Sequence, residues 1–225
     1  MVTEAFRAET ESMSDAIGGE DDASFARPSP CPPWTVGELV YHVRMAIGRL
    51  PGMVAAPEPG GDNLVTAAGY YKADPRFSPA TNAERIASAQ RGADALGSAA
   101  ALVRDFESAR REAVAAVRAA SPARVVLTRH GDRMLLGEFL RTRVLEVAVH
   151  GLDLAAGLDR RPWMTPAAAS VIEEMVMPPG ATGSLRQAFR CDHAELIAMV
   201  TGRRPLSDAQ ALLIERCGVL PLVLR

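Results

Sequence analysis

Four ionisable side chains fall on one stripe of an otherwise apolar segment. They are Arg143, Glu146, His150 and Asp153, spaced i, i+3, i+7 and i+10. The other positions from Val144 to Ala156 are apolar or glycine. This spacing puts the four charges on one face of an α-helix. Because a helix that is apolar around the rest of its surface is normally buried, the stripe faces either a thin strip of solvent or a buried partner that needs charge.

The residues alone allow two interpretations of this stripe. In the first, Glu146 and His150 are merely neighbours on the wet edge of the helix. In the second, they ligate one metal ion, because side chains at i and i+4 lie on adjacent turns and can converge on one cation, as in helical zinc motifs. A metal ion also compensates the cost of burying such groups. The second interpretation requires a third ligand from another segment.

His42 is the candidate for that third ligand. It lies near the edge of an apolar helical face that begins after a capping box, Thr35 with Glu38. A histidine at this position can also be an ordinary core residue whose ring nitrogens are hydrogen-bonded, so the position does not decide the role of His42. His130 follows a short strand pattern and is expected to be exposed in a turn.

A second possible metal group lies near the end of the chain. Cys191, His193 and Glu195 are spaced i, i+2 and i+4, which does not point three side chains in one direction on a helix. Asp192 between them is typical of a helix start, where a carboxylate caps backbone N–H groups. This group is therefore the weaker candidate.

The elements that must position these side chains are mainly helical. Helices are predicted at about 4–17, 35–50, 98–120 and 135–156. Four prolines within 28–33 exclude a helix there and predict an extended entry. Residues 51–80, rich in glycine and proline, predict a long loop with short helical turns, of the kind that often forms a pocket wall.

The remaining segments predict little β-structure. A strand and a turn that can close as a hairpin are expected over residues 124–133. Beyond residue 160 the pattern predicts two or three short helices, the first opening at Thr165-Pro166 and others at Asp192–Val200 and Ser207–Cys217.

Composition limits the class of protein. The 225 residues carry 25 basic and 27 acidic side chains, a net charge of −2, which lacks the basic footprint of a general nucleic-acid binder. No apolar run approaches the roughly 20 residues that span a membrane, and the acidic N-terminus lacks the apolar core of a signal peptide. Three cysteines without a CxxC pair fit a reducing compartment. The sequence therefore predicts a cytoplasmic protein that binds neither nucleic acid nor membrane.

Two motifs resemble those of a known family. Residues 31–42, CPPWTVGELVYH, are similar to the entry C-x-x-W-T-V-x-D/E-L-x-x-H of the mycothiol-dependent maleylpyruvate isomerases. Residues 146–155, EVAVHGLDLA, resemble the helix E-x-x-x-H-x-x-D-L-A of the same family. This family is a branch of the DinB-like helical bundles and is actinobacterial in distribution. That agrees with a composition in which Lys72 is the only lysine and the other basic residues are arginines.

The resemblance implies a fold and a site. The fold class is mainly α, with a DinB-like metal-binding four-helix bundle over residues 1–160 and a short, mostly helical C-terminal appendage over 161–225. The bundle is expected to hold Zn²⁺ or another divalent metal through His42, Glu146 and His150. Cys31 and Trp34 are expected to serve packing, and Asp153 to orient a ligand or cap a neighbouring segment.

The resemblance also implies a function. The implied protein is a zinc-dependent enzyme that uses a low-molecular-weight thiol, mycothiol, to attack a small electrophile, as an S-transferase or a cis–trans isomerase. Five arginines are candidate clamps for a carboxylated substrate: Arg76, Arg160, Arg161, Arg203 and Arg204. The C-terminal part departs from the family pattern, in which a small α/β domain follows the bundle. Two alternatives stay open: a metal-dependent hydrolase, and a non-catalytic bundle that binds a small molecule or a partner.

Overall fold

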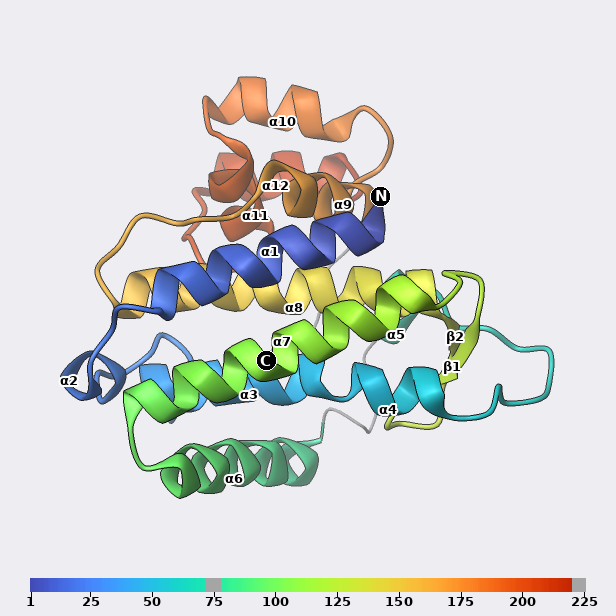
Figure 1. The fold of residues 1–225 in the computed structure, drawn as a ribbon. Coiled ribbons are helices and arrows are strands. Elements are labelled where there is room, and N and C mark those ends of the chain that lie inside the picture. Colours follow the sequence, from blue (N-terminus) through green and yellow to red (C-terminus); the bar gives the residue numbers. More distant parts are fainter. Residues whose placement is uncertain (72–77, 220–225) are drawn as a thin grey trace.

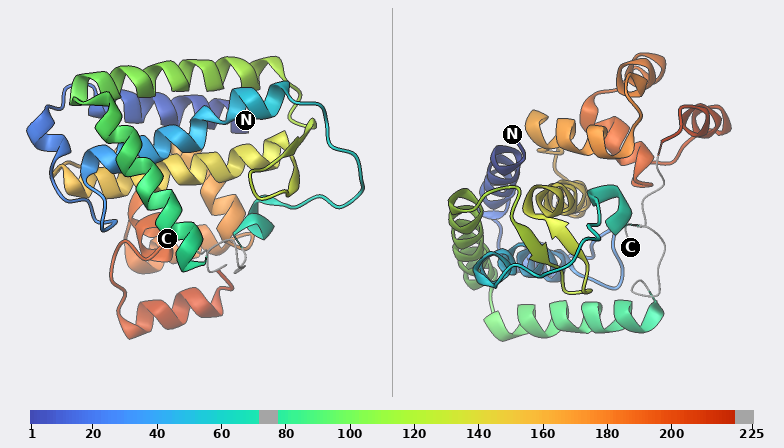
Figure 2. Two further views of the ribbon diagram at one scale, coloured as in Figure 1. Left: turned by 90° about the horizontal axis from the view of Figure 1, so that it is seen from below. Right: turned by 90° about the vertical axis from the view of Figure 1, so that its right-hand side faces the viewer.

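The protein is a helical bundle with a two-stranded hairpin at one end (Figure 1). The computed structural model describes residues 1–71 and 78–219. Four long helices form the bundle: α1 (Val2–Ile17), α3 (Val36–Gly48), α7 (Ala99–Ala119) and α8 (Leu136–Gly157). Helices α1 and α3 each pack against both α7 and α8, and Figure 2 shows the bundle end-on in its right-hand view. The mainly α class and the four-helix bundle predicted from the sequence are confirmed.

Helix α8 lies at the centre of the molecule. It packs against α1, α3 and α9 (Pro166–Val176), and most of its residues are buried all around its circumference. Two members of the charged stripe, Arg143 and Asp153, are themselves buried. The stripe is therefore not a wet edge, because it faces the interior of the protein.

The predicted capping box starts helix α3. The Glu38 backbone N–H donates to Thr35 Oγ1 at 3.2 Å, and the Thr35 backbone N–H donates to Glu38 Oε2 at 2.7 Å. Before it, α2 (Asp22–Phe25) leads into the proline-rich turn, where the Ser29 hydroxyl donates to the Trp34 carbonyl at 2.7 Å. These contacts place His42 two turns into α3, on its buried side.

The segment predicted as a long loop holds two short helices in its described part. They are α4 (Leu50–Ala55) and α5 (Ala67–Tyr70), as the prediction of short helical turns allowed. Helix α6 (Pro79–Leu96) follows, capped by the Ser78 hydroxyl, and is an element that the sequence did not predict. It crosses the bundle obliquely and packs mainly on α3 (Figure 2). Its pattern is weak because Ala89 is its only fully buried residue.

The predicted hairpin is confirmed. Strands β1 (Val125–Leu127) and β2 (Arg133–Leu135) pair antiparallel, with Val126 opposite Met134. Gly131 takes a positive φ of 84° in the turn, which favours glycine. The hairpin carries Arg129 and His130 to the bundle end where α5 lies.

The C-terminal region lies on the side of the bundle opposite α6 (Figure 1). After α9 come α10 (Ala181–Phe189), α11 (His193–Val200) and α12 (Asp208–Arg216). Thr165, Asp192 and Ser207 cap their helices with their side chains, as their positions predicted. A buried carboxylate joins this region to the bundle, since Glu9 of α1 accepts from the Thr165 backbone N–H at 2.8 Å and from its hydroxyl at 2.6 Å. The domain boundary at residue 160 stays a prediction.

No helix in the described part of the chain is long and apolar enough to span a membrane.

Candidate metal centre

Three side chains from two helices converge in the bundle interior. His42 Nε2 of α3 lies 3.0 Å from Glu146 Oε1 of α8, and His150 Nε2, one turn along α8, lies 3.6 Å from the same oxygen. The ligand atoms of all three lie within 4.8 Å of one another. The structure thus brings together the three residues that the sequence placed in one metal site.

Charges around this group keep its carboxylate ionised. Burial opposes ionisation, but hydrogen bonds with His150 and His42 and the charge of Arg143 hold the pKa of Glu146 well below its usual range. Burial lowers the pKa of His42 to about 4. At His150, hydrogen bonds with Asp153, Cys31 and Glu146 outweigh burial and hold the pKa well above its usual range, so metal binding would displace a proton from that ring. A neutral imidazole and a charged carboxylate are the forms in which these residues bind divalent metals. The donor set therefore fits a zinc ion.

Aromatic contacts hold the His42 ring in place. Trp34 stacks on it with ring centroids 4.6 Å apart, and the His150 ring meets it edge-on at 5.1 Å. The His42 Nδ1 atom is buried and has no hydrogen-bond partner among the described residues. On this side the ring is therefore held by packing, while its Nε2 contacts Glu146. Trp34, expected to serve packing, does so directly against a candidate ligand.

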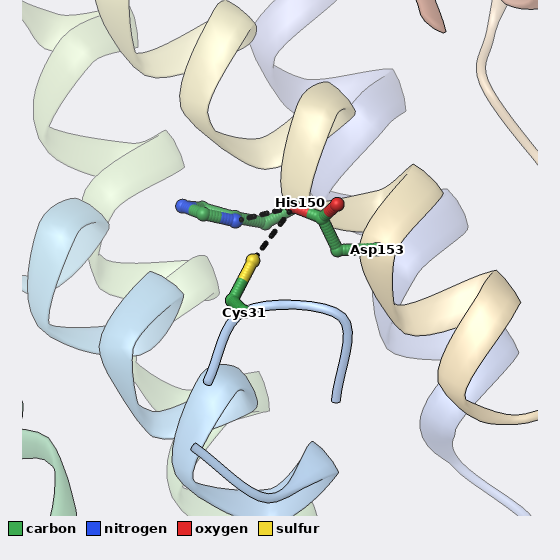
Figure 3. Close-up of side chains that lie close together, drawn as sticks. All are labelled: Cys31, His150 and Asp153. Carbon is green, nitrogen blue, oxygen red and sulfur yellow. Dashed lines mark hydrogen bonds and ion pairs between the residues drawn. The ribbon is translucent and has the colours of Figure 1, made fainter. Parts of the chain in front are cut away.

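Asp153 and Cys31 form a second group around His150. Figure 3 shows the Cys31 thiol rising from the turn before α3 toward the Asp153 carboxylate, beside the His150 ring. Asp153 Oδ2 lies 3.0 Å from His150 Nδ1 and accepts from Cys31 Sγ at 3.2 Å. Arg203 adds two contacts of 3.2 Å, one to each Asp153 oxygen.

These contacts favour one of the two possible metal groups. Cys31, His150 and Asp153 also place one ligand atom each within 4.8 Å of the others. However, the Arg203 guanidinium already neutralises the Asp153 carboxylate, leaving it poorly suited to a cation. An Asp153 carboxylate that accepts from Nδ1 of a ligating histidine would fix the tautomer and orientation of that ring. This geometry agrees with the orienting role expected for Asp153.

Two hollows meet at the candidate centre, and both are lined by His42 and His150. The first, here called the inner pocket, lies among α3, α5, α8 and the hairpin, and its lining includes Arg49, Tyr70 and Arg143. The second, here called the outer groove, lies among the proline-rich turn, α6, α8 and α11, and its lining includes Cys31 and Arg204. Both hollows thus lead to the same two histidines.

The structure also decides two other sequence predictions. Cys191, His193 and Glu195 do not converge, as their spacing indicated: His193 Nδ1 lies 2.6 Å from Glu173 Oε1, and its Nε2 lies 2.8 Å from Arg186 Nη1. These contacts commit the ring to joining α9, α10 and α11. His130, expected to be exposed, is half-buried and lines the inner pocket.

The candidate arginine clamps divide into several groups. Arg203 reaches the site, and Arg204 lies in the outer groove, paired with Glu195 at 2.7 Å. Arg160 instead hydrogen-bonds the end of α1, Arg161 is exposed on the surface, and Arg76 lies outside the described residues. No local sequence pattern indicates that Arg203 contacts Asp153, because 50 residues separate them.

A family model decides where the chain belongs. The model described as the mycothiol maleylpyruvate isomerase N-terminal domain matches residues 6–155, which is most of the bundle and includes both motifs. The chain belongs to this family. The resemblance seen in the sequence is therefore confirmed, and the chain is a member of a family of enzymes.

Solved structures show the same fold. A crystal structure of the mycothiol-dependent maleylpyruvate isomerase is 19% identical, with a TM-score of 0.58 over 90% of this chain and 88% of that chain. A histidine-to-alanine mutant of that isomerase is also 19% identical, with a TM-score of 0.51 over 81% of this chain and 70% of that one. The first match extends past the bundle into the C-terminal region. A comparison with curated proteins finds no significant match.

Proposed function

We propose that this protein is a zinc-dependent enzyme that uses mycothiol to attack a small electrophile. The convergence of His42, Glu146 and His150 in the bundle interior carries the proposal. Membership of the mycothiol-dependent isomerase family supports thiol-dependent isomerisation as the general type of reaction. Three free cysteines fit the reducing cytoplasm in which such a thiol is kept reduced.

The chemistry requires an ionised thiol. A free thiol with a pKa of about 8.5 is only about 3% ionised at pH 7. Zinc held by these three ligands would leave a coordination position open and would favour the thiolate form of a thiol bound there. Full ionisation accounts for at most roughly 30-fold, so positioning must supply the rest of any large acceleration.

The residues of the chain supply that positioning. Trp34 and the Glu146 carboxylate fix the His42 ring from two directions. Asp153, held in turn by Arg203, fixes the His150 ring at Nδ1. Cys31 donates to Asp153 and is not needed as a nucleophile, because the cosubstrate brings its own thiol.

The fate of the thiol adduct separates two reactions. When the thiolate adds to a conjugated double bond, rotation about the resulting single bond followed by loss of the thiol gives cis–trans isomerisation. When the adduct is retained, or loses another group, the enzyme is an S-transferase. We place isomerisation first because of the family to which the chain belongs.

The test begins with metal content. Elemental analysis of protein purified without an affinity tag or added metal should find about one zinc per chain in the wild type and in Cys31→Ala, and little in His150→Ala. Retention of zinc by His150→Ala, or its absence from reconstituted wild type, would contradict the site. Thiol consumption by metal-loaded protein with a panel of electrophiles then tests the reaction, and thiol-independent turnover would instead favour hydrolysis by water.

A further inference from the structure

The inner pocket contains positive charge that the protein balances only in part. Arg143 lines it beside the candidate centre and is 7% exposed. Its Nε donates to Thr142 Oγ1 at 3.2 Å, and its guanidinium stacks over Phe139 at 4.9 Å. The nearest carboxylate oxygen that the described residues offer is Glu146 Oε2, 3.9 Å from Nη2. That distance is too long for a hydrogen bond.

The excess of positive charge around Arg143 increases when Glu146 serves as a metal ligand, because the charge of Glu146 is then shared with the cation. Burial opposes the charge of Arg143, but Glu146 and Tyr71 hold its pKa above the usual value, so the buried guanidinium stays charged and favours further acceptors. Since the pocket opens beside it, an anionic oxygen of a ligand can provide the missing acceptor. A guanidinium fork matches a carboxylate in particular, with two parallel N–H···O bonds.

Two further arginines stand at the mouth of the inner pocket. Arg49 and Arg129 line it and are exposed, and no carboxylate of the described residues forms an ion pair with either. Burial of part of its side chain and the nearby charges of Arg129 and Arg143 lower the pKa of Arg49. This shift agrees with three guanidinium groups gathered at one pocket, where Glu146, 3.9 Å from Arg143 Nη2, is the one carboxylate among the described lining residues.

The outer groove differs in its charge balance. There, Arg204 contacts Glu195 at 2.7 Å, and Arg203, which lines both hollows, contacts Asp153 at 3.2 Å. The described lining of the outer groove holds three arginines and two carboxylates, whereas that of the inner pocket holds five arginines and one carboxylate, Glu146. Positive charge is therefore less fully balanced in the inner pocket.

The shape of the inner pocket suits a small flat molecule. Tyr70 and Phe139 line it with their rings in a T-shaped arrangement, 6.2 Å between centroids, and Met45 and Met53 add flexible apolar surface. Aromatic faces favour planar, conjugated groups, and methionine adapts to their outline. A short conjugated carboxylate meets both the charge and the walls.

We propose that the inner pocket binds the electrophile by a carboxylate on Arg143, the specificity-determining residue, while the thiol enters from the outer groove. The inference rests on the proposed function in assigning the bound anion to the electrophile. Arg49 and Arg129 attract the anion to the mouth, and Arg143 fixes it beside His42 and His150. None of these three arginines was among the clamps suggested by the sequence.

The test measures binding without turnover. Maleate, a small planar dicarboxylate, and its neutral dimethyl ester are titrated calorimetrically into wild type, Arg143→Lys and Arg141→Lys, at matched metal content and without thiol. Arg141 is the matched control, because it lies on the same helix but pairs outward with Glu174 at 3.2 Å. Thermal melting of each variant checks the fold, and lysine keeps the charge.

We expect wild type and Arg141→Lys to bind maleate equally and more tightly than the ester. Arg143→Lys should weaken maleate binding about tenfold or more, since lysine lacks the bidentate fork, and leave ester binding unchanged. Equal maleate affinity in wild type and Arg143→Lys, or no preference for the acid in wild type, would overturn the proposal.

A second titration tests the separation of the two hollows. Saturating maleate should leave the affinity for mycothiol unchanged, whereas competition between them would overturn the assignment of the thiol to the outer groove. If maleate binding depends on Arg143 but no electrophile consumes thiol, the anion site stands and the proposed enzymatic function fails. The two hypotheses therefore have distinguishable failures.

Discussion

The Asp153 carboxylate has three partners from three parts of the chain. His150, Cys31 and Arg203 all lie within 3.2 Å of it. Such a carboxylate orients a metal ligand without touching the metal, and its loss typically costs 10- to 100-fold in metal affinity. The buried Asp153 carboxylate thus serves to hold the His150 ring in place.

We predict that Asp153→Asn lowers zinc affinity by roughly 10- to 100-fold. Competition against a chromophoric chelator measures this directly. Cys31→Ala, which removes a neighbour of the same carboxylate, should bind zinc as wild type does. The reverse pattern, with Cys31→Ala the more damaging change, would assign the metal to the Cys31, His150 and Asp153 group instead.

The sequence predicted part of this site, for a physical reason. Glu146 and His150 share one helix, so their i, i+4 spacing alone places them on one face. His42 was predicted as a ligand from the motif that contains it and from its position on a helix face. Arg203 and Trp34 reach the site through packing between distant segments, which no local periodicity encodes.

The end of helix α8 approaches the start of α3 too closely for any side chain. A Cβ placed on Gly157 would lie 2.9 Å from Val36 Cγ2, and Val36 is fully buried. We predict that Gly157→Ala destabilises the protein by about 1–3 kcal/mol through overpacking. Urea unfolding followed by circular dichroism measures the change.

Gly183→Ala on α10 is the control for that variant. A Cβ there would meet nothing within 4 Å, and alanine favours a helix over glycine. The free energy of unfolding of Gly183→Ala should be equal to that of wild type or slightly higher. Equal stability of Gly157→Ala and wild type would show that α3 and α8 can separate without cost.

The contact between Glu9 of α1 and Thr165 at the start of α9 should make the stability of the protein depend on pH. Burial raises the pKa of Glu9 from 4.5 to about 7, and its Oε1 atom has no partner in the described structure. The folded state thus keeps a proton that the unfolded state loses, so this residue lowers stability as pH rises from 4.5 to 7. The loss amounts to roughly 3 kcal/mol at most.

Glu9→Gln should remove this dependence, because glutamine stays neutral and still offers an oxygen to Thr165. Unfolding free energies of the variant and wild type, measured from pH 4.5 to pH 8, should diverge in favour of the variant above pH 5. Parallel curves would place Glu9 in a well-solvated environment.

Helix α6 is the long helix that hydrophobic periodicity did not predict. The helices with a strong apolar face were predicted within a few residues, α3 and α8 among them. In α6, however, the only fully buried residue is Ala89. A helix that lies across the outside of a bundle needs little apolar surface, so periodicity does not reveal it.

The whole molecule carries a net charge of −2 but gathers cations at one opening. Arg49 and Arg129 stand at the mouth of the inner pocket, where they should speed the approach of an anion. We predict that Arg49→Gln combined with Arg129→Gln slows maleate association severalfold at low salt and flattens its salt dependence. Stopped-flow measurements at several ionic strengths test this.

Arg111→Gln combined with Arg118→Gln is a control for charge removed elsewhere, since both residues are exposed on α7, outside the inner pocket. It should leave the association rate unchanged. Equal slowing by both pairs would show that total charge, and not its position, controls the approach.

Two openings onto one pair of histidines also constrain the order of events. Because His42 and His150 line both hollows, the two reactants can be present together, which predicts intersecting and not parallel lines in double-reciprocal plots. A single inhibitor could then bridge both openings, joining a carboxylate arm to a thiol arm. Linking the arms makes the second binding event intramolecular, so such a compound should bind far more tightly than either half.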